Sequence, residues 1–225
     1  MKVESKLKLI QKQIQEACHK VNRDVNDVKI IAVTKYVSIE RAKEAVEAGI
    51  IHLGENRDNG FLEKWEALGD KPVWHFIGTL QSRKVKNIIH KVDYVHSLDR
   101  LSLAKEMNKR ANRKINCFVQ VNVSGEESKQ GMEPSEVKKF ILKLKEFENI
   151  KVVGLMTMAP LTDNEPVIRS CFRKLKLLQT ELQKLNLDYA PCHELSMGMS
   201  NDFSIAIEEG ATMIRVGTAL VGEDD

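Results

Sequence analysis

The chain has 225 residues, 42% of them hydrophobic and 30% charged, as expected for one globular domain that needs no disulfides to be stable. The net charge is +3 at pH 7, and lysines are interleaved with carboxylates along the predicted helices, so we expect no nucleic-acid partner. The first residues carry no secretory signal and no run approaches the roughly 20 apolar residues of a membrane span. We therefore expect a cytoplasmic protein with no membrane partner.

Apolar residues at steps of three and four, from Leu7 to Val21, predict an amphipathic opening helix. After it, short apolar runs alternate with segments of helical periodicity, as in strands buried on both faces and joined by helices. The predicted strands are Ile30–Val33, Ile50–Leu53, Val73–Ile77, Val92–Val95, Cys117–Val123, Val152–Met156, His193–Ser196 and Met213–Val216. The predicted helices are Ile39–Val46, Phe61–Leu68, Gln81–Ile89, Leu101–Ala111, Val137–Leu144, Ile168–Leu182 and a short one through Ile207.

Repeated βα units predict parallel strands with right-handed crossovers, and eight such units can close into one (β/α)8 barrel over residues 1–225. A doubly wound open sheet is the competing architecture. The chain ends soon after the last predicted strand, so we expect no final helix and expect the opening helix to cover that gap. The four cysteines form no C-x-x-C or paired His spacing, which predicts buried reduced thiols and no metal site; they are Cys18, Cys117, Cys171 and Cys192.

Functional side chains of such barrels lie in the loops after the carboxyl ends of the strands. The candidates by this rule are Thr34, Lys35, Gly54, Glu55, Asn56, His75, Gly78, Asn122, Met156, Ser196–Ser200 and Arg215–Thr218.

Lys35 is the first of these to suggest chemistry. It comes just after the apolar run Ile30–Val33, and desolvation at a barrel mouth would make its amine nucleophilic, as Schiff-base chemistry requires. The ordinary alternative is a strand-end lysine that reaches solvent.

A phosphate site is predicted from the last two strands, whose following loops often bind phosphate in this fold. Ser196–Ser200 leads directly into a predicted helix, so Ser200 and neighbouring amides can face an anion. Gly217 permits close approach of the backbone, and Thr218 adds a hydroxyl.

Arg215 lies inside the last predicted strand. Its guanidinium either pairs with a barrel carboxylate, Glu55 or Glu194, or contacts a ligand at the mouth. His52, His75 and His193 lie near strands, but their spacing gives no set of metal ligands. We interpret them as core histidines whose hydrogen bonds are made within the protein.

The blocks AVTK (32–35), GEN (54–56), WHFIGTLQSRK (74–84), QVNVSGEESKQG (120–131), GLMTM (154–158), SMGMSND (196–202) and RVGTALVG (215–222) run in one order over nearly the whole chain. Together they resemble the YggS/PROSC-type pyridoxal phosphate homeostasis proteins. The polar segment 124–131 is interpreted as a loop that acts as a lid. One departure is Asp58–Gly60, expected in the loop entering a helix, where many members carry a Gln-Glu pair.

The resemblance implies a single barrel like the N-terminal domain of alanine racemase, with pyridoxal 5′-phosphate (PLP) bound to Lys35 as a Schiff base. It implies phosphate contacts at Ser200, Gly217 and Thr218. Arg215 would lie by the pyridine nitrogen and keep it unprotonated, because two cations in contact repel. The resemblance also implies that Asn56 lies near the cofactor.

The resemblance favours a non-catalytic protein that stores, buffers or delivers PLP, with PLP-dependent apo-enzymes as recipients and a monomeric or weakly dimeric state. The alternative is a weak amino-acid racemase, which needs acid–base groups on both faces of the substrate carbon. Lys35 could supply one group, and Tyr36, Tyr94 or Tyr189 the other. A third possibility is a barrel enzyme that forms a Schiff base between Lys35 and a phosphorylated substrate, as an aldolase does.

Overall fold

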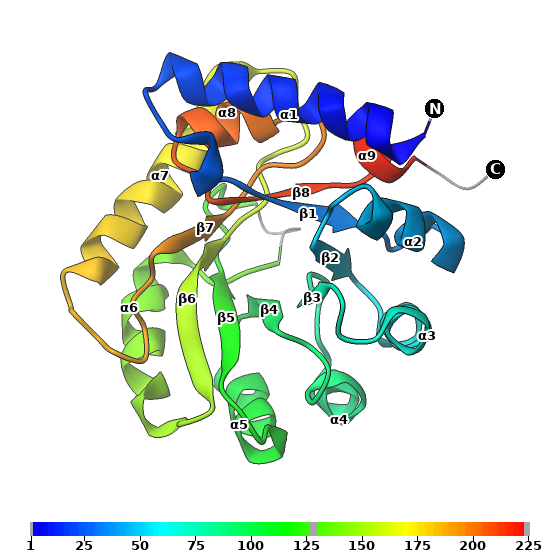
Figure 1. The fold of residues 1–225 in the computed structure, drawn as a ribbon. Helices are drawn as coiled ribbons and strands as arrows, with labels where there is room; N and C mark the ends of the chain where they lie inside the picture. The colour runs from blue at the N-terminus through cyan, green and yellow to red at the C-terminus, as the bar shows by residue number, and fades with distance from the viewer. Residues whose placement is uncertain (1, 127–129, 223–225) are drawn as a thin grey trace.

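The computed structural model describes residues 2–126 and 130–222. Eight strands form one closed parallel barrel in sequential order, with β1 hydrogen-bonded to both β2 and β8 (Figure 1). The closure confirms the predicted (β/α)8 architecture and excludes the open sheet. The strands are β1 (Lys29–Val33), β2 (His52–Glu55), β3 (Val73–Phe76), β4 (Tyr94–Leu98), β5 (Ile115–Gln120), β6 (Ile150–Met156), β7 (Glu194–Ser196) and β8 (Met213–Val216).

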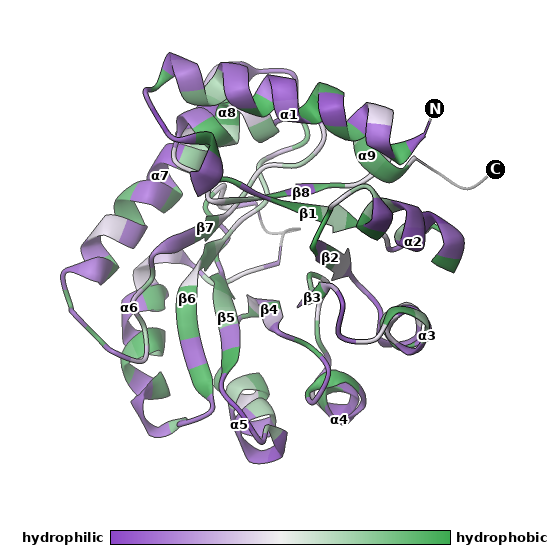
Figure 2. Ribbon diagram, viewed as in Figure 1, coloured by the Kyte–Doolittle hydropathy of each residue, from purple (hydrophilic) through white to green (hydrophobic). Residues whose placement is uncertain are grey.

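Helices surround the barrel, and hydrophobic and hydrophilic residues alternate along α1 and α7, as expected for helices with one face on the barrel (Figure 2). The α-helices are α1 (Val3–Lys20), α2 (Ile39–Glu47), α3 (Asp58–Leu68), α4 (Val85–Ile88), α5 (Leu101–Arg110), α6 (Pro134–Lys143), α7 (Glu165–Gln183), α8 (Phe203–Glu208) and α9 (Thr218–Val221). Short 3-10 helices lie at Val25–Asp27, Ser82–Lys84 and Leu144–Glu146.

The main core fills the layer between strands and helices, whereas the hydrophobic cluster inside the barrel is small. That inner cluster consists of the buried residues Ile31, Phe118, Met156 and Met213. Polar side chains take up other interior positions, among them the buried His75 and His96 and the half-buried His52, as described below.

Several element boundaries differ from those predicted. β5 ends at Gln120 rather than Val123, because Asn122 and Met132 pair through their backbones and turn the chain out of the sheet. β2 begins only at His52, since the Ile50 amide still closes α2 through a bond to the Ala45 carbonyl. The predicted helix 81–89 is a 3-10 turn followed by α4, and α3 begins at Asp58 and so includes the segment 58–60 expected as a loop.

The expectation of no final helix is wrong, because α9 forms one turn after β8. The predicted role of the opening helix is confirmed, since α1 packs against α8 and α9 across the β8 side of the barrel (Figure 1). Its buried face is formed by Val3, Leu7, Ile10, Ile14, Ala17 and Cys18.

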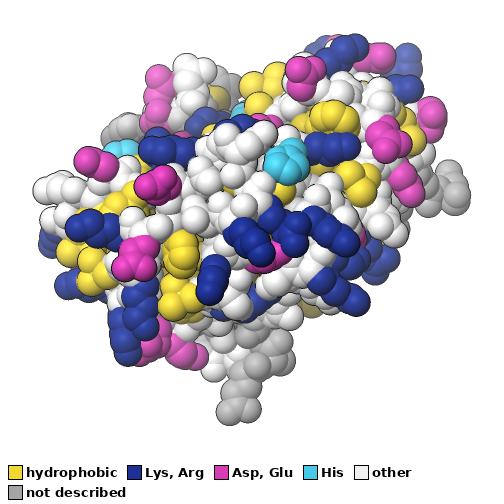
Figure 3. All heavy atoms as spheres, turned by 90° about the horizontal axis from the view of Figure 1, so that it is seen from below, with side chains coloured by type: hydrophobic (Ala, Val, Ile, Leu, Met, Phe, Trp, Pro, Cys, Tyr) yellow, Lys and Arg dark blue, Asp and Glu magenta, His cyan; other side chains and the backbone are white. Residues whose placement is uncertain are grey.

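Surface charge is less even than the interleaved sequence suggests. On the face seen from below, formed around α4 and α5, Lys and Arg side chains gather near the centre and Asp and Glu lie mostly toward the edges (Figure 3). Among the described residues, no helix combines the length and apolar character needed to cross a bilayer.

Candidate functional site

The six residues predicted for the cofactor site lie toward one end of the barrel. Lys35 and Asn56 come just after β1 and β2, Ser200 lies in the loop after β7, and Gly217 and Thr218 follow β8. Because all strands are parallel, their carboxyl ends share one end of the barrel, the mouth. Arg215 lies within β8, opposite Ile31 of β1.

Close backbone contacts draw the loops of the mouth together. A Cβ atom added to Gly217 would lie 3.6 Å from the Cβ of Val33, so the β8 loop runs beside the end of β1. A Cβ on Gly78 would lie 2.3 Å from the Asn56 carbonyl oxygen, so only glycine lets the β3 loop pack there. No hydrogen bond joins any two of the six predicted residues, all of which are described.

Lys35 is exposed, and its Nζ lies 4.8 Å from the ring centroid of Tyr36. The expectation that its ammonium is desolvated is therefore wrong. The reason is local: β1 ends at Val33 and the chain turns, with the Val37 amide donating to the Thr34 carbonyl, which carries Lys35 out to solvent. The amine is accessible to an aldehyde, and burial is not what would make it reactive.

A buried cluster fixes the turn that carries Lys35. Glu55 Oε1 accepts a hydrogen bond of 2.6 Å from the Thr34 hydroxyl and lies 3.0 Å from Lys64 Nζ. The Glu55 and Lys64 side chains are only 1% and 7% exposed, so this ion pair is almost fully desolvated. The cluster thereby joins the ends of β1 and β2 to α3.

Asn56 offers unused hydrogen-bonding capacity at the mouth. Its Oδ1 atom is buried and has no hydrogen-bond partner among the described residues. A buried amide left unpaired costs free energy, about 1 to 3 kcal/mol, unless a ligand or water satisfies it. This orphaned atom fits the predicted place of Asn56 beside a polar cofactor.

The two predicted phosphate loops are held against each other. The Arg215 amide donates to the Gly198 carbonyl at 2.9 Å, which joins the β7 loop to β8. Gly198 has φ +92°, and a Cβ there would lie 2.6 Å from the Ala206 Cβ, so glycine is required for the loop to pack on α8. The hydrogen bonds among the described residues leave the amides of Ser200 and Thr218 unused, so both can face an anion.

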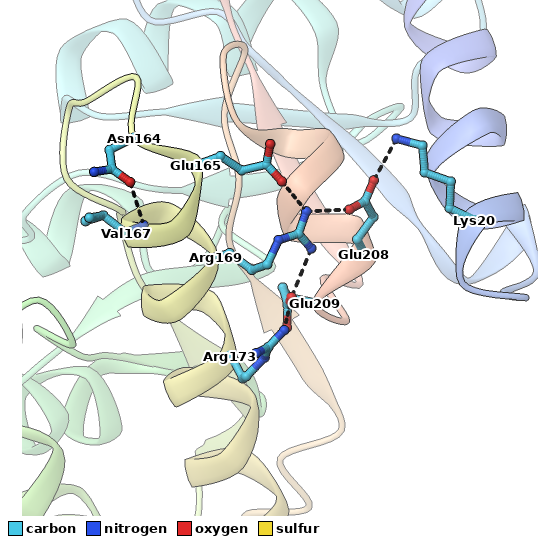
Figure 4. Close-up of polar contacts among 8 residues, drawn as sticks. All are labelled: Lys20, Asn164, Glu165, Val167, Arg169, Arg173, Glu208 and Glu209. Atoms are coloured by element: carbon cyan, nitrogen blue, oxygen red, sulfur yellow. Dashed lines mark hydrogen bonds and ion pairs between the residues drawn. The ribbon is translucent and has the colours of Figure 1, made fainter.

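An ion-pair cluster anchors α8, the helix that follows the β7 loop (Figure 4). Arg169 of α7 lies 2.7 Å from Glu208 and 3.0 Å from Glu209, at the far end of α8. Glu208 also pairs with Lys20 of α1 at 3.0 Å, and Glu209 with Arg173 at 2.9 Å. The cluster therefore fixes α8 between α7 and α1.

Arg215 is buried, only 4% exposed, with its guanidinium among the ends of β6, β7 and β8. Nη1 donates to the Ser196 hydroxyl at 2.6 Å and Nη2 to the Thr157 carbonyl at 2.9 Å. Of the two alternatives for Arg215, the pairing with Glu55 or Glu194 does not form, because each of these glutamates is paired with a lysine instead. Burial lowers the pKa of Arg215 to about 10, against the opposing effect of Asp202, so it stays charged at neutral pH.

Sequence reasoning missed Ser196 and Thr157 as partners of Arg215, and it missed His96. The signal that could have found His96 is its place directly after the predicted strand 92–95, at a strand end. His52 and His75 are satisfied by hydrogen bonds, as expected. Among the described residues, no three or more His, Cys, Asp or Glu side chains are placed so that they could hold a metal ion.

The predicted lid is described only in part, because residues 127–129 lie outside the described chain. Ahead of them, the Asn122 side chain accepts from the Gly125 amide at 3.2 Å and donates to the Glu126 carbonyl at 2.9 Å. After them, Gln130 accepts from the Thr79 hydroxyl at 2.6 Å. Two hollows of about 440 and 400 Å³ lie along α7, and none of the six predicted residues lines either.

The family model described as "Alanine racemase, N-terminal domain" matches residues 7–225, which defines the class of the barrel. The chain is 46% identical to the "Pyridoxal phosphate homeostasis protein" of Aquifex aeolicus, over 97% of this chain and 96% of that one. It therefore belongs to the family of pyridoxal phosphate homeostasis proteins.

Solved structures agree with this assignment. An "unknown protein" from Bifidobacterium adolescentis superposes with a TM-score of 0.93 at 31% identity, over 97% of this chain and 94% of that one. PipY of Synechococcus elongatus, solved with PLP bound, gives a TM-score of 0.81 at 31% identity, over 93% of this chain and 100% of that one.

Proposed function

We propose that this protein binds PLP at the barrel mouth, holds it as a Schiff base on Lys35, and serves intracellular PLP homeostasis by storing, buffering and delivering the cofactor. The PLP bound to PipY and the names of the curated relatives support the cofactor. The observation that carries the proposal for this chain is the exposed amine of Lys35 at the mouth, beside the β8 loop.

Each predicted residue has a role that its surroundings support. The aldehyde of PLP condenses with a lysine amine and releases water, and the exposed Lys35 is the accessible amine. Ser200, Gly217 and Thr218 would bind the phosphate, and Asn56 would use its unpaired amide on the ring. Arg215, a cation at neutral pH, would disfavour protonation of a neighbouring pyridine nitrogen and so keep the ring a weak electron sink. A weak electron sink suits a carrier better than a catalyst.

The test is the visible absorbance of purified wild-type protein with added PLP, beside Lys35→Ala and a control, Lys43→Ala, which removes an exposed lysine on α2. We expect a Schiff-base band in the wild type and the control and not in Lys35→Ala. Borohydride should fix the cofactor to the peptide that contains Lys35. A wild type that takes up no PLP would contradict the proposal and favour a phosphosubstrate enzyme.

Delivery is tested separately by mixing the loaded protein with a PLP-dependent apo-enzyme and following recovery of that enzyme's activity. We expect recovery to be faster than from the same concentration of the borohydride-reduced protein, which cannot release its cofactor. Equal rates would contradict delivery. Cytoplasmic location and a monomeric or weakly dimeric state stay predictions, to be checked by cell fractionation and by sedimentation.

A weak racemase is the second candidate, and one contact favours it. Of the three tyrosines considered, Tyr36 lies against Lys35, whereas Tyr94 stacks on His75 inside the barrel. Racemisation requires exchange of the substrate α-proton, so incubation with L- and D-alanine in D2O is the decisive assay. Deuterium incorporation that is lost in Tyr36→Phe would support a racemase, and no incorporation favours the carrier.

A further inference from the structure

A row of hydrogen bonds crosses the barrel interior from β2 to β8. His52 Nδ1 lies 2.9 Å from His75 Nε2, and His75 Nδ1 lies 2.8 Å from His96 Nε2. His96 Nδ1 lies 2.9 Å from the Ser196 hydroxyl oxygen, which accepts a bond of 2.6 Å from Arg215. We call His52, His75, His96 and Ser196 the interior histidine chain, which ends at Arg215. Neither the fold nor the predicted Schiff-base chemistry requires three histidines here.

The cation at one end sets the direction of every bond. A guanidinium has donors and no acceptor, so the Ser196 hydroxyl accepts from Arg215. Among the described residues, His96 Nδ1 is the one hydrogen-bond acceptor that the Ser196 proton has, so Ser196 donates to it. His96 then carries its proton on Nε2 and donates to His75 Nδ1. By the same reasoning His75 donates from Nε2 to His52 Nδ1. All three neutral rings therefore hold the Nε2–H tautomer.

The surroundings keep these rings uncharged. Burial, with neighbouring positive charge, holds the pKa of His75 and His96 well below the ordinary value. Tyr94 stacks on His75 with ring centroids 4.5 Å apart, and Phe118 stacks on His96 at 4.4 Å. Burial also lowers the pKa of His52, whose electrostatic neighbours include Lys29, Asp93 and Glu194.

A neutral chain is an unusual counterpart for a buried arginine. Arg215 has no carboxylate within ion-pair distance among the described residues, although buried cations are ordinarily paired. In the interior histidine chain every acceptor atom faces the Arg215 side and every proton points away from it. The aligned dipoles therefore stabilise the cation and leave it charged, whereas a carboxylate would neutralise it.

From this arrangement we infer that the interior histidine chain is a one-directional, neutral hydrogen-bond relay that orients Arg215 and leaves its full positive charge for the occupant of the barrel mouth. Ser196 and His96 are then positioning residues, which act on a ligand only through Arg215. The effect on the ligand rests on the proposed function. The tautomers of the interior histidine chain and its contact with Arg215 do not depend on that function.

The first test is nitrogen NMR of histidine-labelled protein without cofactor at pH 7. We expect the Nε2–H tautomer at His52, His75 and His96, with the exposed His19, His90 and His193 as internal references. Ser196→Ala removes the hydroxyl that links His96 to Arg215, so His96 and His75 should each show a mixture of the two neutral tautomers. Ser196→Thr keeps the hydroxyl and should keep the wild-type pattern. Circular dichroism checks that each variant is folded.

The second test is PLP affinity. Loss of one of the two hydrogen bonds to the guanidinium should weaken binding about tenfold in Ser196→Ala, with recovery in Ser196→Thr. An Nδ1–H tautomer or a charged ring at any of the three wild-type histidines would overturn the inference, as would unchanged tautomers in Ser196→Ala. If the wild type binds no PLP, the proposed function fails, and the tautomers still decide the relay.

Discussion

Glu55 and Lys64 show how much one buried pair can control. Their contact joins α3 to the end of β2, and through Thr34 it fixes the turn that presents Lys35. Both charges are nearly excluded from solvent, so each depends on the other. Glu55 Oε2, moreover, has no hydrogen-bond partner among the described residues, which leaves the carboxylate little other compensation.

Lys64→Met should lower the free energy of unfolding by about 3 to 5 kcal/mol, because it leaves the Glu55 carboxylate buried without its counter-ion. The double variant Lys64→Met with Glu55→Gln should recover much of that loss, since no buried charge remains. Lys8→Met, at an exposed pair with Glu4, should leave the free energy of unfolding nearly unchanged and serves as the control. Urea unfolding measures all three, and no recovery in the double variant would contradict the explanation.

Gly198→Ala tests the packing of the β7 loop. The added methyl would meet Ala206 and Phe203 at a backbone φ of +92°, so we expect a loss of about 2 to 4 kcal/mol and weaker PLP binding. Gly49 has a nearly equal φ of +96° with nothing within 4 Å of such a methyl. Gly49→Ala should therefore cost only the conformational strain, about 1 to 2 kcal/mol, with PLP binding unchanged. Equal losses in the two variants would exclude the steric explanation.

At the scale of elements, α8 is a short helix of six residues that depends on its neighbours. Its buried residues Phe203, Ala206 and Ile207 face the barrel, and its other end is held by the charges of Glu208 and Glu209. The loop that precedes α8 is one of the two predicted phosphate loops. Displacement of α8 would therefore also move the β7 loop at the barrel mouth.

Arg169→Met should destabilise the protein by about 1 to 2 kcal/mol at pH 7, because it removes three ion pairs at once. Burial alone would raise the pKa of Glu208 and Glu209, but their hydrogen bonds with basic side chains outweigh it and hold both pKa values below 4.5. The stabilisation is therefore complete above about pH 5 and is lost as the pH falls through the folded-state pKa values.

Urea unfolding of wild type and Arg169→Met between pH 7 and pH 3 checks this prediction. The two stabilities should converge as the pH falls, and Arg173→Met, at a 62% exposed side chain, should show a smaller difference throughout. If the free energies of unfolding of wild type and Arg169→Met differed by the same amount across this pH range, ionisation of Glu208 and Glu209 would not be the source of the stabilisation.

At the scale of the whole molecule, closure of the barrel brings together segments that are far apart in the chain. β1 pairs with β8, so the loop with Lys35 lies beside the loop with Gly217. Burial of all four cysteines follows from the same closed architecture. Burial raises the pKa of Cys192 to about 12 and also raises that of Cys117, so neither thiol is a nucleophile in the folded protein.

Ellman's reagent should thus label Cys117 and Cys192 only when the barrel opens. We expect labelling at neutral pH to be slower than that of the urea-unfolded chain by orders of magnitude, and to accelerate in Lys64→Met about tenfold for each 1.4 kcal/mol of lost stability. Peptide mapping identifies the labelled sites. Fast labelling of Cys117 in the stable wild type would contradict its burial.

The alternation of apolar runs and helical periodicity predicted eight parallel strands joined by helices, because strands buried on both faces appear as continuous apolar runs. It left the open sheet as an alternative, since closure depends on the pairing of β1 with β8, which no local pattern contains. Strand-end positions likewise predicted where Lys35, Asn56 and Gly217 lie. The exposure of Lys35 could not be predicted, since it depends on a turn that begins at Thr34. Nor could the partners of Arg215, because they depend on which strand ends meet across the barrel, and no local pattern contains that information.

Because β1 pairs with β8, the order in which the strands follow one another along the chain could be changed without changing their neighbours. In space the eight strands form a ring without a first or last member, and the first and last helices, α1 and α9, pack against each other (Figure 1). A circular permutant, with a linker across the present ends and new ends opened between α5 and β5, would keep every strand neighbour. Residues that meet at the mouth would then do so in a different sequence order, so the site depends on the ring of strands and not on which strand comes first in the chain.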